Sequence, residues 1–118
     1  MINLNDYREL IESALEYSGG THTFDDVAAG IASGHMQLWP TEKACAVTEI
    51  VVYPRKNVLH VFLAAGDLEQ IVNGIDAVAA WGKSQGCESL TLNGRHGWQR
   101  VLKNRGWTPV MTVMERVL

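Results

Sequence analysis

Two polar side chains interrupt apolar stretches that are typical of β-strands, and either one could take part in proton transfer. Glu49 lies within the stretch 44–53 and His60 lies within the stretch 58–63. A carboxylate or a neutral imidazole at such a position can act as a general base if substrate reaches it. The alternative is structural, because Glu49 can face solvent on an antiparallel strand and His60 can be a partly buried edge residue.

A polar loop near the C-terminal end is a second candidate for binding chemistry. Asn93, Arg95 and His96 are spaced by Gly94 and Gly97, and the loop leads into a helix. Backbone N–H groups at a helix N-terminus, with Arg95 and His96 beside them, could bind an anion or a protein partner. The alternative is a tight strand–helix turn that needs its glycines for backbone geometry alone.

Composition limits the remaining classes of function. The chain has 118 residues, 47% of them hydrophobic and 19% charged, with a formal net charge of −3. These values predict a single domain over 1–118 and give little support for nucleic-acid binding. The four histidines lack metal-ligand spacing, so we expect no metal. We expect the two cysteines, Cys45 and Cys87, to be reduced and buried. No apolar run is long enough for a membrane span, so we expect a cytoplasmic protein.

The stretch that must position these side chains runs from Val58 to Gly86. Residues 58–63 read as a strand buried on both faces, Ala64 to Gly66 as a short turn, and 67–83 as a helix. The apolar stripe of this helix contains Leu68, Ile71, Ile75, Val78 and Gly82. A strand followed directly by an amphipathic helix predicts that the next strand, 88–92, lies parallel beside it.

The other elements follow from local signals. Asn5 is the expected N-cap of a first helix that ends near residues 18–20, and Thr23 with Asp26 forms an expected capping box for a second. Strands are predicted over 36–39 and 44–53, a helix over 98–105 and a last strand over 107–117. The predicted order is helix, helix, three strands, helix, strand, helix, strand.

Two short motifs in this order resemble a known family. Trp81 to Cys87 resembles the helix end and turn W-A-x-x-x-G-C, and Arg100 to Trp107 resembles the last helix and turn x-x-L-Y-x-x-x-G-F. With the strand–helix unit before them, they resemble the GNAT acetyltransferase superfamily, and most closely its shortened phage and prophage proteins. The resemblance implies an α+β fold with a mixed, mostly antiparallel sheet flanked by helices. It also implies that the family's first strand is missing.

The departures from the family concern its cofactor, acetyl-CoA. The family holds the pyrophosphate in an R/Q-x-x-G-x-G/A loop, but the matching positions, 67–71, contain no glycine. Only Gly66 is close, so the turn Ala64–Gly66 is the expected contact if CoA binds. Asp67 is a good N-cap with Gln70 as its box partner, and it opposes an anion at the helix N-terminus. Leu102 occupies the position at which the family often has a tyrosine that acts as the general acid.

Two functional hypotheses remain open. The first is a GNAT-like protein of phage or prophage origin with a degenerate acetyl-CoA site and a binding or assembly role. It implies a protein partner or self-association, in the host cytoplasm or in the virion, and no cofactor. The alternative is an acyl-CoA-dependent N-acetyltransferase with an atypical pocket, in which acetyl-CoA would be the cofactor and Glu49 or His60 the base.

Overall fold

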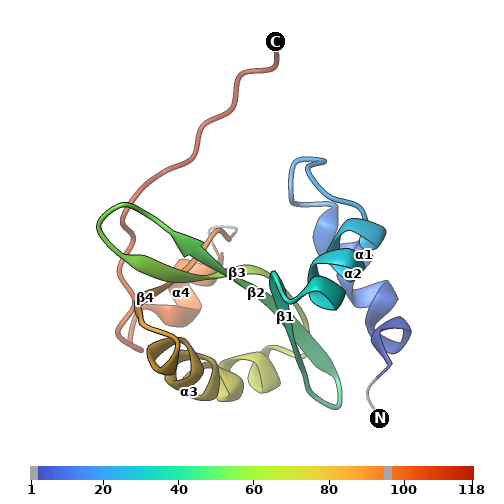
Figure 1. The fold of residues 1–118 in the computed structure, drawn as a ribbon, viewed down its shortest axis with the longest axis horizontal. Helices are drawn as coiled ribbons and strands as arrows, with labels where there is room; N and C mark the ends of the chain where they lie inside the picture. The colour runs from blue at the N-terminus through green and yellow to red at the C-terminus, as the bar shows by residue number, and fades with distance from the viewer. Residues whose placement is uncertain (1–2, 95–96) are drawn as a thin grey trace.

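The fold was examined in a computed structural model that describes residues 3–94 and 97–118. The described residues form an α+β structure with one sheet, as the sequence predicts (Figure 1). The elements in chain order are the 3₁₀-helix η1 (Leu4–Tyr7), α1 (Arg8–Leu15), α2 (Phe24–Ser33), β1 (Met36–Pro40), β2 (Ala44–Val52), β3 (Asn57–Gly66), α3 (Leu68–Ser84), β4 (Cys87–Leu92) and α4 (Gly97–Leu102).

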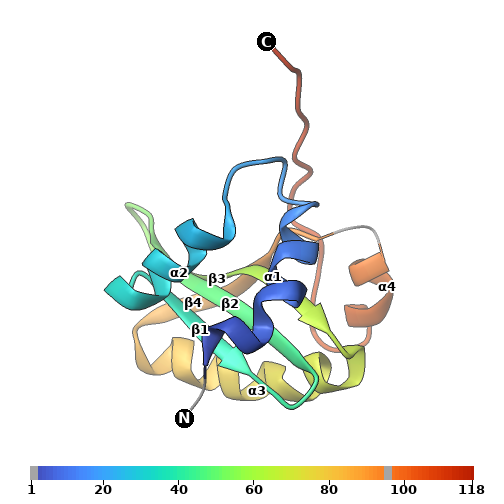
Figure 2. The same ribbon diagram turned by 90° about the vertical axis from the view of Figure 1, so that its right-hand side faces the viewer.

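The sheet has the strand order β1-β2-β3-β4. β1, β2 and β3 form an antiparallel meander, whereas β4 lies parallel to β3. The prediction that 88–92 runs parallel beside 58–63 is therefore confirmed. Helix α3 makes the crossover and lies on one face of the sheet, while α1 and α2 lie on the other (Figures 1 and 2).

The main core lies between the sheet and the first two helices. Its most buried members are Ile11 of α1, Val27 of α2 and Val47 of β2, all fully removed from solvent. Ile11 and Val27 come from the two helices, and Val47 comes from the sheet on which they pack. Burial of such aliphatic side chains contributes about 1.5–3 kcal/mol each, so this layer holds α1 and α2 on the sheet.

Local capping explains where the N-terminal helices begin. The Thr23 hydroxyl accepts a hydrogen bond from the Asp26 backbone N–H, and the Asp26 carboxylate accepts one from the Thr23 N–H, which confirms the predicted capping box. The prediction that Asn5 is the N-cap of the first helix is wrong. The Asn3 side chain caps η1 instead by accepting from the Asn5 N–H at 3.0 Å, so the helical segment begins two residues earlier.

The face of α3 is only partly as predicted. Val78 and Gly82 are buried, and Gly82 lies directly against Leu59 of β3. Ile75 is half-buried at the edge of a cavity, and Leu68 is 47% exposed, so the expected stripe does not pack along its whole length. The physical reason is that the N-terminal part of α3 stands away from the sheet around this cavity.

Two expectations about the strands are wrong. Ala64–Gly66 is the end of β3 and not a turn, because Ala44, Cys45 and Ala46 of β2 continue to pair with it. Residues 107–118 form neither helix nor strand, although a last strand was expected there. Strand-forming sequence alone does not make a strand, since the backbone needs a neighbouring strand as its hydrogen-bonding partner.

Candidate functional site

The pairing of the two parallel strands ends before β3 does, which leaves a gap beside the end of β3. Their register runs from Asn57 opposite Cys87 to Val61 opposite Leu92, where β4 ends. β3 continues to Gly66, so its edge over 62–66 has no strand partner on this side among the described residues. Crevices beyond the carboxyl ends of parallel strands are the usual ligand sites of sheets with crossover helices. This gap is therefore the first place to look for a function.

A β-bulge lies where the gap begins. Val47 of β2 is opposite Leu63 and Thr48 is opposite Val61, which leaves Phe62 as an extra residue in β3. The Phe62 ring packs against His22 on the helix α1/α2 face, with 4.5 Å between ring centroids. A bulge bends its strand and changes the direction of the backbone groups beyond it. It therefore sets the course of the residues 63–66 that border the gap.

The end of β3 is fixed to the loop between β1 and β2. A Cβ atom on Gly66 would lie 2.3 Å from the Lys43 carbonyl oxygen, and the residue has φ +107°, so only glycine fits. The Asp67 N–H donates to the same carbonyl at 3.0 Å. The Gln70 Oε1 atom accepts from the Lys43 N–H at 2.7 Å and from the Thr41 hydroxyl.

The N-terminus of α3 is capped by its own carboxylate. The Asp67 Oδ2 atom accepts a hydrogen bond from the Gln70 N–H at 3.1 Å, as expected from the sequence. The prediction that the Gln70 side chain bonds back to Asp67 is wrong, because that side chain accepts hydrogen bonds from Thr41 and Lys43 instead. Glu69 adds a second carboxylate in the first turn. The end of the helix thus carries negative charge where its dipole would favour an anion.

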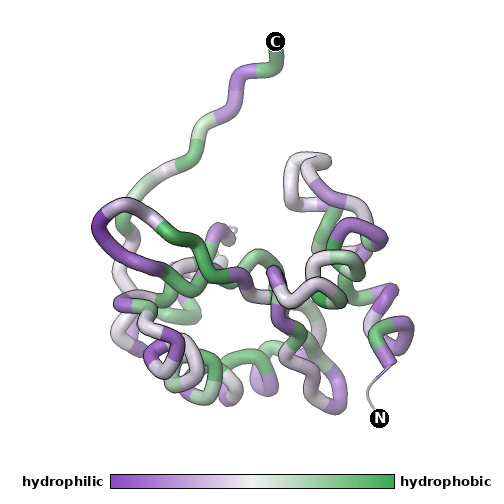
Figure 3. Tube along the Cα trace, viewed as in Figure 1, coloured by the Kyte–Doolittle hydropathy of each residue, from purple (hydrophilic) through white to green (hydrophobic). Residues whose placement is uncertain are grey.

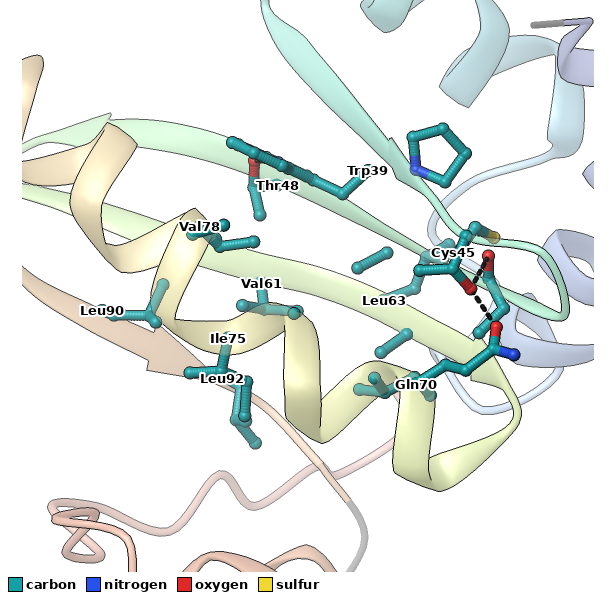
Figure 4. A pocket seen from close by; sticks show the side chains of 18 of the residues that line it. Trp39, Cys45, Thr48, Val61, Leu63, Gln70, Ile75, Val78, Leu90 and Leu92 are labelled. Carbon is teal, nitrogen blue, oxygen red and sulfur yellow. Dashed lines mark hydrogen bonds between the residues drawn. The ribbon is translucent and has the colours of Figure 1, made fainter.

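A cavity of about 240 Å³ lies between α3 and the sheet (Figure 4). Side chains from the strands and from α3 point into it, mainly apolar ones such as Val61, Leu63, Ile75, Val78, Leu90 and Leu92. The buried Thr48 hydroxyl accepts from the Trp39 indole N–H at 2.9 Å and donates to the Gln37 amide oxygen at 2.8 Å. The Thr48 hydroxyl is therefore already hydrogen-bonded as donor and as acceptor. With mainly apolar side chains around it, the cavity suits an apolar group.

Cys45 of β2 also lines this cavity, while its side chain belongs to the main core. Burial raises the pKa of the Cys45 thiol to about 11, so it is protonated and unreactive at neutral pH. Both cysteines are free, as expected, but only Cys45 is buried and Cys87 is half-buried. Cys45 therefore provides no nucleophile at neutral pH.

A second cavity of about 490 Å³ lies between α1, the end of β3 and α4. The three residues expected to contact a cofactor, Ala64, Ala65 and Gly66, all line it. Trp98 of α4 lines both cavities, so they are neighbours. This cavity therefore lies beside the part of β3 that continues beyond its pairing with β4.

The two candidate bases lie elsewhere. Glu49 and His60 are opposite each other on β2 and β3, and His60 Nδ1 lies 2.9 Å from the Thr91 hydroxyl of β4. Burial lowers the pKa of His60, an effect that the nearby Glu49 carboxylate partly offsets, so the imidazole is neutral at neutral pH. Neither residue is among those that line the two cavities. The structure thus pairs the candidate bases but does not bring them to the predicted cofactor residues.

The C-terminal candidate loop is described in part. Asn93 is exposed and lines the 240 Å³ cavity, whereas the predicted Arg95 and His96 lie outside the described residues. α4 ends at Leu102 and not near 105 as expected. Leu102 is 3% exposed, and it packs as a core residue at the position matched to the family's tyrosine.

Sequence reasoning missed Thr48 and the side-chain role of Gln70. Threonine is common in strands, so nothing in the local sequence marks Thr48 as the hydrogen-bonding partner of Trp39. Gln70 was assigned to its own helix, but Thr41 lies 29 positions away in the sequence. Only the fold brings these two residues together.

Two classes of site find no support in the described residues. Within 3–94 and 97–118, no group of three or more His, Cys, Asp or Glu side chains could hold a metal ion. No helix in the same ranges has the length and apolar character that crossing a membrane requires.

Comparisons with known proteins show which fold this is. No family model and no curated protein sequence matches the chain. Among solved structures, a protein of Thermus thermophilus is similar, with a TM-score of 0.69 and 18% sequence identity. The alignment covers 99% of this chain and 94% of the Thermus chain. A Trypanosoma brucei acetyltransferase is similar at TM-score 0.63 and 16% identity, covering 99% and 96%. A GNAT family acetyltransferase of Staphylococcus aureus is similar at TM-score 0.58 and 12% identity, covering 99% and 95%. At these identities the similarity shows the GNAT fold alone.

Proposed function

We propose that this GNAT-fold chain has a degenerate acetyl-CoA site and serves as a binding or assembly protein. The observation that carries the proposal is the Asp67 carboxylate on the N-terminus of α3, where it accepts a hydrogen bond from the Gln70 N–H. Acetyltransferase activity in this fold needs that end of the helix for the cofactor's pyrophosphate. A helix end that carries its own carboxylate is a poor site for an anion.

The surrounding turn supports the same conclusion. An extended nest of backbone N–H groups needs several glycines, but here β3 runs as a paired strand to Gly66 and the helix begins two residues later. The Asp67 N–H is already bonded to the Lys43 carbonyl oxygen. Acetyl-CoA therefore does not fit this turn in the manner of the family.

The candidate catalytic groups point the same way. A buried leucine, Leu102, stands where the family has its acidic tyrosine, and a leucine cannot protonate a leaving thiolate. Glu49 and His60 lie apart from the cavity that Ala64, Ala65 and Gly66 line. The absence of both candidate bases from the described lining of that cavity supports binding over acyl transfer.

A second candidate, an acyl-CoA-dependent N-acetyltransferase with an atypical pocket, is favoured by one observation. Beyond Val61, β3 has no strand partner on its β4 side among the described residues, and the 490 Å³ cavity is lined by Ala64, Ala65 and Gly66 of this part of β3. A pantetheine arm could enter there and meet the free edge of β3 without a pyrophosphate cradle. The fold neighbours named as acetyltransferases add to this candidate by analogy only.

Isothermal titration with acetyl-CoA separates the two candidates. We expect no binding in the micromolar range for the unaltered protein. A one-to-one isotherm that is abolished by Ala65→Phe, which narrows the 490 Å³ cavity, would establish the enzyme hypothesis instead. The double substitution Asp67→Asn and Glu69→Gln is the matched control. It keeps an N-cap and removes two negative charges, so a gain of binding there would identify charge as the obstacle.

Phage or prophage origin, with a family member shortened by one strand, is part of this proposal and rests on the sequence resemblance. Neighbouring genes that encode virion or tail proteins would support it. Neighbouring genes of metabolism or antibiotic resistance would favour the enzyme candidate.

A further inference from the structure

The 240 Å³ cavity between α3 and the sheet is lined without charge. Among the described residues, every side chain that lines it is uncharged. The Thr48 hydroxyl already donates and accepts a hydrogen bond, and the Gln70 Oε1 atom accepts two. Hydrophobic colour covers much of the strands and stretches of α3 (Figure 3). Such a cavity holds water poorly, because a buried water needs about two to four polar partners.

The size of this cavity sets it apart from an ordinary packing defect. Protein interiors contain few voids larger than a water molecule. An apolar cavity of about 150 Å³ stays dry and can take one benzene ring. The cavity between α3 and the sheet measures about 240 Å³. It therefore has room for a flat molecule of about two fused rings.

The cavity reaches the surface between α3 and the end of β4. Ala77 of α3 and Asn93, directly after β4, both line it and are both exposed. A Cβ atom on Gly74, one turn before Ala77, would meet nothing within 4 Å. Small residues of α3 thus leave an entrance, and Asn93 supplies a polar side chain beside it.

Aromatic rings form a large part of the wall. Trp39, Trp98 and Trp107 come from distant parts of the chain, and all three line the cavity. Trp81 meets the ring of Trp39 edge to face and so supports it from behind. Aromatic rings favour offset or edge-to-face contact with one another. A flat aromatic ligand gains from such contacts, whereas a charged ligand would lose its hydration without a partner.

From these observations we propose that this cavity is a binding site for a small, uncharged aromatic molecule of about two fused rings. A polar substituent on the ligand would lie at the entrance beside Asn93. Ala65 and Gly66, two of the predicted cofactor residues, line the 490 Å³ cavity and not this one. The inference goes beyond the proposed function, because it names a ligand class and does not depend on whether acetyl-CoA binds.

Isothermal titration with 2-naphthol at neutral pH tests the site. This probe has two fused rings, one hydroxyl and no charge. We expect one-to-one binding in the micromolar range and a raised thermal midpoint, because the ligand binds the folded chain alone. Naphthalene-2-sulfonate, the charged analogue, should bind at least about tenfold more weakly, because the described lining offers no cation to pair with it. The aliphatic 1-octanol should also bind more weakly, because it lacks a ring.

A filled cavity supplies the second test. Gly74→Leu places a side chain in the open space and should weaken 2-naphthol binding at least about tenfold while the protein stays folded. Ala80→Leu is the matched control, since Ala80 is exposed on the same helix and lines neither cavity. It should leave binding unchanged. Circular dichroism checks the fold of both variants.

Several results would overturn the inference. They are no binding of 2-naphthol, binding that Gly74→Leu leaves unaltered, and an equal affinity for naphthalene-2-sulfonate or for 1-octanol. The probe series on the unaltered protein decides the question even if a variant fails to fold. Displacement of 2-naphthol by acetyl-CoA would also overturn it, because it would assign this space to the enzyme candidate.

Discussion

Asp67 decides what the N-terminus of α3 can accept. Its carboxylate caps the helix, its N–H is bonded to the Lys43 carbonyl, and Gly66 before it leaves no room for a side chain. A single residue thus satisfies the helix locally and opposes an anionic ligand. The Gln70 N–H cannot do both, since a backbone N–H that donates to a capping carboxylate is not available to bind phosphate.

Removal of this cap should be measurable. Asp67→Ala should lower the free energy of unfolding by about 1 kcal/mol, because the Gln70 N–H loses its acceptor. Asp67→Asn should be nearly neutral, since asparagine is an equally good N-cap. Urea denaturation of the two variants beside the unaltered protein gives both values. Equal losses in the two variants would mean that the negative charge, and not the hydrogen bond, stabilises this end of α3.

At the scale of residues, the sequence predicted what depends on near neighbours. The capping box of Thr23 and Asp26 and the cap at Asp67 each join residues three positions apart, so a local pattern suffices. The role of Gln70 could not be predicted because its partners, Thr41 and Lys43, come from a distant loop. Glu49 and His60 were correctly placed in strands, but their distance from the cavities depends on the whole sheet.

Helix α3 shows how one element packs well at one end and loosely at the other. A Cβ atom on Gly82 would lie 2.8 Å from Leu59 Cδ2, so α3 and β3 are in close contact there. A Cβ atom on Gly74 would meet nothing within 4 Å, because that residue borders the 240 Å³ cavity. The two glycines belong to the same helix but lie in opposite packing environments.

The pair gives a matched test of this packing. Both Gly74→Ala and Gly82→Ala gain about 1 kcal/mol of helix propensity. Gly82→Ala also forces an atom into a filled space, which usually costs about 1–3 kcal/mol. We therefore expect Gly74→Ala to stabilise the protein and Gly82→Ala to be less stable than Gly74→Ala by at least about 1 kcal/mol. Equal thermal midpoints and urea midpoints for the two variants would contradict this picture of α3.

At the scale of elements, periodicity predicted the helices and the sheet but not their ends. β3 is longer than expected because β2 pairs with Ala64 and Ala65, and such pairing is a property of two strands. The predicted last strand does not form, because it lacks the neighbouring strand that such pairing requires. Residues 107–117 have a β-forming composition, but no strand in the described chain pairs with them.

Considered as a whole, the molecule consists of a folded body and an extended C-terminal tail, residues 109–118. Every residue from 108 to 118 is exposed, so the tail adds little buried area to one chain. We expect deletion of residues 110–118 to change the free energy of unfolding of the monomer by less than about 0.5 kcal/mol, the usual range for surface changes. Urea denaturation at a concentration where light scattering reports a monomer is the measurement. A loss above about 2 kcal/mol would show that the tail packs on its own chain.

The placement of the aromatic residues has an optical consequence. The chain contains four tryptophans, three of which, Trp39, Trp98 and Trp107, line the 240 Å³ cavity. The fourth, Trp81, meets the ring of Trp39 edge to face, with 5.7 Å between centroids. Almost all of the ultraviolet emission of this protein therefore originates around one apolar space. Its wavelength and intensity should respond to anything that enters that space, so the protein carries its own fluorescent reporter of occupancy.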